Sequence, residues 1–419
     1  MFKLFKNPLV EANGFTQDYL QVIKDKKPRS WLKHWDHQQF IPDHFFKSDR
    51  LKLSVDKTPE DNYLYPIFFD PVISSAKENV KLEFFDIPSK VIKDLERGKC
   101  KLYIDHSSEG YDVTYHMKGF DDLTHDMICN TSEVYGIDPK NIFLGSANLK
   151  CYTNVPYNVV VFNGPMFWTE AEQSEEWWEN LRLIKSRTRR PKKLLSMTRT
   201  VRQHRLQFAR ELYVRQLLAE NIYTMPLVHD YVIENHKFTH KPIPESLFKT
   251  LPWYYDIRTI SDINPVNHSL PSSRRFYNEG YVSFVLETFF CYSDYNIVDK
   301  PLEYELDISE KTMKPIAMLH PFIVMGQPGV LKHLRSMGFK TFHGWWDESY
   351  DDILNPNERF DALLKLYEEL NSYSHKTLAD MLYEMSDILQ HNFFRYKSLK
   401  ENENYFNGFI STLNESFKS

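Results

Sequence analysis

Features that mark secreted, disulfide-bonded and membrane-spanning proteins are scarce in this sequence. Its 419 residues include only four cysteines, which are widely spaced and form no Cys-x-x-Cys pair, so neither a disulfide framework nor a zinc knuckle is indicated. The chain contains no stretch of about 18 consecutive apolar residues, and its first residues lack the apolar segment of a secretory signal. We therefore expect a cytoplasmic protein with reduced cysteines and no membrane partner.

Excess charge and phosphate-loop motifs are also missing. The formal net charge is −5, which argues against a protein that coats nucleic acid by charge alone but leaves room for a local basic surface. The sequence has no Gly-x-x-x-x-Gly-Lys, Gly-x-Gly-x-x-Gly or Gly-x-Ser-x-Gly motif. Residues 34–44 are rich in histidine and aspartate but lack a His-x-x-x-His pattern, so we expect a surface tract there and no metal site.

The length and composition favour two α/β domains. A chain of this length exceeds one ordinary hydrophobic core, and its 42% hydrophobic residues are enough for two. In the first half, short apolar runs bounded by turns predict strands at residues 101–105, 141–144 and 158–162, and a periodic stretch predicts a helix at residues 121–135. Strands separated by a helical crossover indicate a parallel sheet.

A second α/β pattern follows the basic tract of residues 185–193, which reads KSRTRRPKK. The pattern predicts strands at residues 194–197, 282–286, 321–325 and 339–342, and helices at residues 203–218, 309–319 and 330–337. From residue 358 onward, apolar stripes at helical spacing predict packed helices. We expect two Rossmann-like lobes, residues 1–185 and 186–357, that face each other across a cleft, with C-terminal helices in residues 358–419 crossing back to the first lobe.

One polar turn stands out at residues 309–326, which read SEKTMKPIAMLHPFIVMG. Ser309 is a good helix N-cap, so Glu310 and Lys311 are expected in the first turn, where unpaired backbone N–H groups suit a phosphate. A carboxylate there can accept hydrogen bonds from ribose hydroxyls, and a lysine can neutralise a diphosphate. Alternatively, Glu310 only complements the positive end of the helix dipole. Lys314 either reaches the same phosphates or faces water.

A second polar turn, residues 198–205 (TRTVRQHR), also lies between a predicted strand and a predicted helix. Arg199, Arg202 and Arg205, together with His204, form a set that can hold a diphosphate in bidentate fashion. The alternative is an ordinary solvated surface. Two cationic strand-to-helix turns in one domain favour the binding interpretation.

Carboxylates follow a predicted strand of the first domain, at residues 105–109 (DHSSE). Either Asp105 or Glu109 would be placed to deprotonate an acceptor hydroxyl as a general base. A capping role explains Asp105 equally well. These two residues are the candidates for the catalytic base.

The S-E-K turn and the stretch after it resemble the sugar-donor-binding motif of fucosyltransferase-like glycosyltransferases. The longer pattern E-K-T-x-K-P-I-A-x-x-H-P-F-I-V, followed by L-x-S-x-G-F-K-T-F at residues 334–342 and W-W-D-E-S-Y at residues 345–350, resembles a group of proteins encoded by tailed bacteriophages. That group also carries an arginine-rich turn, here residues 199–205, and a glutamate ahead of S-E-K, here Glu287. Some of its members are implicated in glycosylating hydroxylated cytosine in phage DNA, including arabinosyltransferases. The resemblance covers residues 194–360.

The resemblance implies a metal-independent glycosyltransferase of the GT-B type. Its second lobe would bind a nucleotide-sugar, with UDP favoured over GDP and arabinose among the candidate sugars. Glu310 would hold the ribose hydroxyls, Lys311 a phosphate, and Arg202, His204 or Arg205 the diphosphate.

The first lobe would bind the acceptor. The implied acceptor is hydroxylated or hydroxymethylated cytosine in double-stranded phage DNA within the host cytoplasm, and a base in a duplex would have to be flipped out. The basic tract at residues 185–193 either tracks a phosphate backbone or is a solvated linker. Two other functions remain open: transfer to a glycan or protein acceptor, and a catalytically silent nucleic-acid-binding protein.

Overall fold

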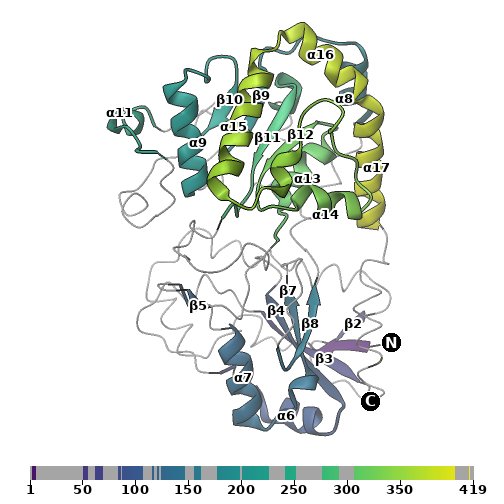
Figure 1. The fold of residues 1–419 in the computed structure, drawn as a ribbon. Helices are drawn as coiled ribbons and strands as arrows, with labels where there is room; N and C mark the ends of the chain where they lie inside the picture. The colour runs from purple at the N-terminus through teal and green to yellow at the C-terminus, as the bar shows by residue number, and fades with distance from the viewer. Residues whose placement is uncertain are drawn as a thin grey trace. The chain divides into compact units, whose positions relative to one another are not determined.

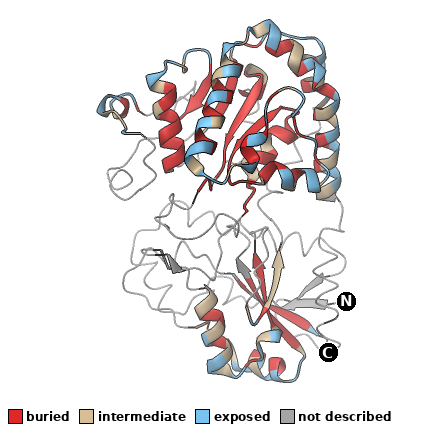
Figure 2. Cartoon of the chain, in the orientation of Figure 1, coloured by how far each residue is buried: buried red, intermediate tan, exposed pale blue. Residues whose placement is uncertain are grey.

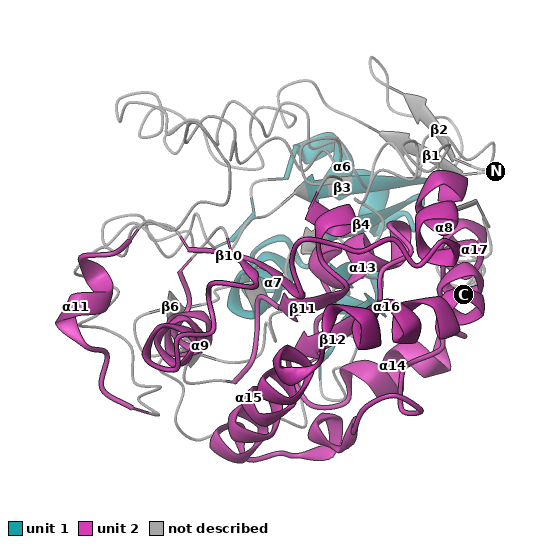
Figure 3. Ribbon diagram, turned by 90° about the horizontal axis from the view of Figure 1, so that it is seen from above, with its two compact units in different colours: residues 1–165, 402–419 teal, residues 166–401 magenta. Residues whose placement is uncertain are grey.

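The protein, seen here as a computed structural model, consists of two compact units. The structure describes residues 2–5, 51–54, 62–68, 84–85, 87–106, 116–117, 120–121, 124–146, 155–161, 177–198, 201–225, 241–251, 276–291, 306–401 and 415. Met1–Pro165 groups with Asn402–Ser419 as the first unit, and Met166–Glu401 forms the second (Figure 3). Each unit contains a parallel sheet, so the chain has two α/β units.

The second unit begins earlier in the chain than the expected boundary at residue 185. Helix α8 (Trp177–Lys185) packs against α16 (His375–Glu384) and α17 (Ser386–Glu401), and the Trp177 ring stacks on Phe393 with centroids 5.6 Å apart. The C-terminal helices therefore belong to the second unit. After them, only Asn402–Ser419 groups with the first.

The described strands of the first unit form a six-stranded sheet in the order β2-β1-β3-β4-β7-β8, with all neighbours parallel (Figure 1). These strands are β1 Phe2–Phe5, β2 Leu51–Ser54, β3 Tyr63–Phe68, β4 Cys100–His106, β7 Ile142–Ser146 and β8 Asn158–Val161. The three strands predicted in this region are confirmed as β4, β7 and β8. The aromatic strand β3 was not predicted.

Among the described residues of this unit, two α-helices accompany the sheet, α6 (Ser89–Glu96) and α7 (Thr124–Tyr135). Buried side chains of both helices join those of the strands in one core, which includes Val91, Leu95, Leu102, Ile104, Met127, Ile128 and Leu144. Helix α7 ends before Gly136, whose φ of 64° is a left-handed conformation that glycine adopts without steric cost. The predicted helix is confirmed, although it starts later, because Phe120–Asp121 pairs as strand β6 with β5 (His116–Met117).

The described strands of the second unit form a four-stranded parallel sheet in the order β10-β9-β11-β12. Its strands are β9 Leu194–Met197, β10 Ile222–Thr224, β11 Val282–Leu286 and β12 Phe322–Met325. From β9 the chain crosses to β10 on one side, returns to β11 on the other side of β9, and continues outward to β12. The order therefore reverses between β9 and β11, which makes this pair the topological switch point of the sheet.

Helices cover both faces of this sheet. On one face, Phe284 of β11 stacks on Phe208 of helix α9 (Gln203–Val214), with centroids 4.9 Å apart, and also contacts Tyr367 of helix α15 (Pro356–Ser372). Neighbouring strand residues point to opposite faces, so Ser283 faces the other side, where it bonds His320, just after helix α13 (Glu310–Ala317). Strands β11 and β12 are buried along their whole length (Figure 2).

The prediction of a strand at residues 339–342 is wrong. This segment follows helix α14 (Val330–Ser336) as irregular backbone with the Phe339 and Phe342 rings buried. Its N–H groups bond elsewhere: Lys340 N donates to Asn392 Oδ1 at 2.7 Å and Phe342 N to Glu348 Oε1 at 2.6 Å. Side-chain acceptors thus replace the partner strand that the apolar pattern led us to expect.

Part of the basic tract at residues 185–193 is packed into the second unit, so the tract is not a wholly solvated linker. Arg190 is buried and donates to the carbonyl oxygens of Tyr277 and Gly280. Lys193 is also buried, and its Nζ donates to the main-chain oxygen of Asn371 at 2.8 Å. Because these two cations bind their own chain, they are not available to a phosphate backbone.

His320 supplies a pH-dependent contribution to stability. Its Nε2 donates to Gly280 O at 2.8 Å and its Nδ1 accepts from Ser283 Oγ at 2.8 Å, which holds a neutral ring. Burial, followed by the nearby Arg190, lowers the pKa of His320 from 6.5 to about 3. Between these values the unfolded chain binds a proton that the folded chain does not, so the free energy of unfolding falls as the pH decreases through this window.

We expect this one group to remove about 1.4 kcal/mol of stability for each pH unit below its unfolded pKa. The measurement is urea unfolding of the wild type, His320→Gln and the exposed-histidine control His343→Gln at pH 7 and pH 5.5. The loss on acidification should shrink in His320→Gln and persist in His343→Gln. Equal losses in all three proteins would contradict the assignment.

Candidate functional site at the carboxyl ends of β9 and β11

The candidate site lies where strands β9 and β11 end. In an open parallel sheet, ligands bind outside the carboxyl ends of the strands at the switch point, because the loops there run to opposite faces and leave a crevice. Helix α9 begins shortly after β9, while Glu287 and Thr288 directly follow β11. Both cationic turns singled out in the sequence therefore reach this edge of the sheet.

The Glu287 carboxylate is the most heavily bonded group of the site. Only 1% of the residue is exposed. Its Oε2 accepts from Thr288 N at 3.0 Å and Ser309 Oγ at 2.5 Å, and its Oε1 accepts from Ser309 N at 3.2 Å and Thr312 Oγ1 at 2.5 Å. The carboxylate therefore ties the end of β11 to the start of α13.

Helix α13 begins as its sequence predicts. Ser309 is the N-cap, with extended φ and ψ of −91° and 179°, and its Oγ accepts from Lys311 N at 3.2 Å. Glu310 follows as the first helical residue, where its carboxylate interacts favourably with the positive end of the helix dipole. Pro315 lies inside the helix without ending it.

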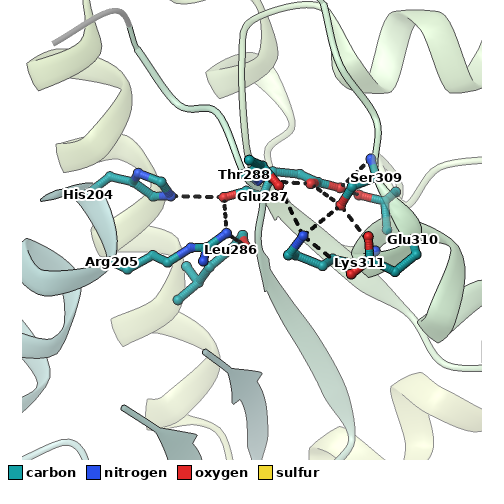
Figure 4. Close-up of polar contacts among 9 residues, drawn as sticks. His204, Arg205, Leu286, Glu287, Thr288, Ser309, Glu310 and Lys311 are labelled. Carbon is teal, nitrogen blue, oxygen red and sulfur yellow. Dashed lines mark hydrogen bonds and ion pairs between the residues drawn. The ribbon is translucent and has the colours of Figure 1, made fainter. Parts of the chain in front are cut away.

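Lys311 projects its ammonium group back over the first turn of the helix (Figure 4). Its Nζ donates to Thr288 Oγ1 at 3.0 Å and Ser309 Oγ at 3.1 Å, and it lies 3.4 Å from Glu310 Oε1. The Lys311 side chain is 28% exposed and that of Glu310 is 12% exposed. A cation and an anion are therefore held side by side at the solvent-accessible end of the site.

The first turn of α9 approaches Glu287 from the opposite side (Figure 4). His204 Nε2 donates to the main-chain oxygen of Glu287 at 3.0 Å, and its ring stacks on Phe290. Arg205 Nη2 donates to Leu286 O at 3.0 Å and to Glu287 O at 2.6 Å. His204 is fully buried and Arg205 is 2% exposed, so both position the end of β11.

The other residues predicted for the site are not placed in direct contact with Glu287 or Lys311 by the described structure. Arg202 is the half-buried N-cap of α9, and its side chain makes no capping hydrogen bond. Lys314 is half-buried in the last turn of α13, a full turn beyond Glu310. Arg199 and Glu109 lie outside the described residues, and the structure describes only the backbone of Asp105, at the end of β4.

Two functional contacts were missed by sequence reasoning, those of Thr288 and Thr312. Thr288 directly follows a predicted buried strand, and Thr312 stands three positions after the N-cap serine. The spacing of Thr312 from the N-cap places its hydroxyl in the first turn of the helix, and this signal was available in the sequence. The side-chain partners are distant in the sequence, Lys311 for Thr288 and Glu287 for Thr312, so no local pattern revealed either pairing.

The site combines opposite charges within a small volume. Glu287 and Glu310 supply carboxylates, and Lys311 and Arg205 supply cations. Burial, followed by the Glu310 carboxylate, raises the pKa of Tyr277. The less buried pair of this set, Lys311 with Glu310, can offer one ammonium donor to an anion and one carboxylate acceptor to hydroxyl groups.

Comparison of the chain with protein-family models, curated proteins and solved structures finds no match. Among the described side chains, no group of three or more His, Cys, Asp or Glu gathers as metal ligands would. None of the described helices combines the length and apolar character that crossing a membrane requires.

Proposed function

We propose that the protein is a glycosyltransferase that binds a nucleotide-sugar at the start of α13. One observation carries the proposal: Lys311 holds its ammonium beside Glu310 at a helix N-terminus, at the switch point of a parallel sheet. Such an end of a helix favours phosphate, and the neighbouring carboxylate is suited to ribose hydroxyls. The resemblance of residues 194–360 to phage glycosyltransferases supports the same assignment.

In the proposed reaction, Lys311 stabilises the charge that develops on the leaving diphosphate. The bond between the anomeric carbon and the β-phosphate oxygen breaks, and the acceptor oxygen forms the new bond to that carbon. The acceptor proton passes to a carboxylate, for which Asp105 and Glu109 are the candidates. A fixed cation helps most because it needs no reorganisation as negative charge appears.

For the acceptor we propose hydroxylated or hydroxymethylated cytosine in phage DNA, and for the fold the GT-B type. This part of the proposal is supported by the resemblance alone. The basic tract at residues 185–193 lends it little support, since Arg190 and Lys193 bind their own chain.

Transfer is tested by incubating the protein with DNA that contains 5-hydroxymethylcytosine or 5-hydroxycytosine and a panel of UDP- and GDP-sugars. We expect the mass of the modified nucleoside to increase by one pentose or hexose with one of these sugar donors. A product only on glycan or protein acceptors would replace the proposed acceptor. Tight, salt-sensitive DNA binding without any mass increase would indicate a silent binding protein.

A further inference from the structure

We infer that Glu287 is a positioning residue that fixes the Lys311 ammonium through the hydroxyl of Ser309. The consequence of this inference for sugar-donor binding rests on the proposed function. Glu287 is too deeply buried to be a ligand contact, and four hydrogen bonds from its own chain already fill its carboxylate. What it controls is therefore the geometry of the groups around it.

The direction of each hydrogen bond in this chain is fixed. A carboxylate only accepts, so Ser309 Oγ uses its single proton on Glu287 at 2.5 Å. That leaves the oxygen of Ser309 free to act only as an acceptor, and it accepts from Lys311 N at 3.2 Å and Lys311 Nζ at 3.1 Å. Glu287 thus sets the orientation in which Ser309 receives the ammonium.

A second branch reaches the same ammonium through the residue after Glu287. Thr288 N donates to Glu287 Oε2, which holds this residue in place, and Thr288 Oγ1 accepts from Lys311 Nζ at 3.0 Å. An ammonium has three donors, and two are used on these hydroxyl oxygens. The third is the donor that a phosphate oxygen would use, and the Glu310 carboxylate lies beside it as an ion-pair partner, with Oε1 3.4 Å from Nζ.

The chain offers a matched pair of variants that separates positioning from simple stabilisation. Ser309 and Thr312 each donate a hydroxyl to Glu287 at 2.5 Å, but only Ser309 contacts Lys311. Ser309→Ala and Thr312→Val therefore remove equivalent bonds from the carboxylate. Only the first also removes an acceptor from the ammonium.

Glu287→Gln tests the carboxylate itself. Its amide nitrogen cannot accept, so one pair of donors loses its partner. When the nitrogen takes the place of Oε2, that pair is Thr288 N and the Ser309 hydroxyl, which is then released to turn. Thr288→Val removes the other hydroxyl acceptor of the Lys311 ammonium and leaves Glu287 unchanged. Ser309→Thr retains the hydroxyl and serves as the conservative rescue.

The experiment is competitive acetylation of the intact protein with acetic anhydride, with the rate at Lys311 measured by mass spectrometry relative to exposed Lys332. The reagent reacts with the nitrogen lone pair, so Nζ must give up its hydrogen bonds to Thr288 and Ser309 before it reacts. We expect the relative rate to rise about fivefold, the factor for one lost net hydrogen bond, in Glu287→Gln, Ser309→Ala and Thr288→Val. It should stay within about twofold of wild type in Thr312→Val and Ser309→Thr, with circular dichroism confirming the fold.

Equal acetylation rates in Ser309→Ala and Thr312→Val would overturn the inference, because Glu287 would then act only on stability. The inference would also be overturned if Lys311 were acetylated at the wild-type rate in both Thr288→Val and Glu287→Gln. This measurement uses no sugar donor, so it is independent of transfer. A wild-type protein that shows the acetylation pattern but transfers no sugar would refute the proposed function and leave the positioning of Lys311 standing.

Discussion

Replacing Lys311 with alanine is expected to lower the rate of sugar transfer about a hundred- to a thousandfold, the cost of removing one preorganised group that stabilises developing charge. The loss should appear mainly in kcat, because the ammonium matters most when the diphosphate leaves. The free energy of unfolding should change by no more than about 1.5 kcal/mol, since the side chain is partly exposed and gives up two hydrogen bonds to hydroxyls. Steady-state kinetics and urea unfolding of the same preparation provide both values.

Lys332→Ala is the matched control for this variant. Lys332 lies in the first turn of α14 with its side chain exposed, and only its main-chain N–H has a structural role, donating to Asp351 at 2.9 Å. Its loss should leave transfer unchanged. Near-normal kcat in Lys311→Ala would remove Lys311 from the sugar-donor site.

Replacing Arg205 with alanine is expected to reduce the free energy of unfolding by about 3 kcal/mol or more, because two buried carbonyl acceptors lose their donor and buried side-chain volume is lost as well. The guanidinium is 2% exposed and bonds the carbonyl oxygens of Leu286 and Glu287, which end strand β11. Tyr223 Oη donates to the Arg205 carbonyl at 3.0 Å, so this turn also joins β10. Urea unfolding at pH 7 measures the effect.

Arg189→Ala is the control for Arg205→Ala. Arg189 is exposed in the basic tract, so its loss should change stability by less than about 0.5 kcal/mol. If Arg205→Ala were as stable as Arg189→Ala but failed to bind UDP or GDP, the guanidinium would be a ligand contact. The main role of Arg205 would then be ligand binding, and not stabilisation of the fold through its buried hydrogen bonds.

Much of the second unit could be predicted from local pattern. The buried strands β9 and β11 match their apolar runs residue for residue, and α13 starts after Ser309 as its capping signal indicates. Strand β10 was missed because three residues are too short to show a period. The strand predicted at residues 339–342 shows the converse, since an apolar run cannot reveal that side chains, and not a neighbouring strand, bind its backbone.

The candidate site was only partly predictable for a related reason. Glu310 and Lys311 are adjacent in sequence, so a helix start was enough to bring them together. In contrast, α9 is buried continuously from Gln203 to Ala209, and no periodicity distinguishes its inward polar residues from a ligand-binding face. Whether Arg205 meets a ligand or its own main chain depends on tertiary contacts with β11, which sequence spacing does not encode.

The most direct test of the account is whether a nucleotide diphosphate protects Lys311. Acetylation of the wild type in the presence of millimolar UDP or GDP, with Lys332 as the internal reference, reports on the one ammonium that the proposed site requires. We predict that one of the two nucleotides slows acetylation at Lys311 about tenfold or more, the factor expected when ligand exceeds its dissociation constant tenfold. Unchanged acetylation of Lys311 under saturating UDP and GDP would contradict a nucleotide site at the start of α13.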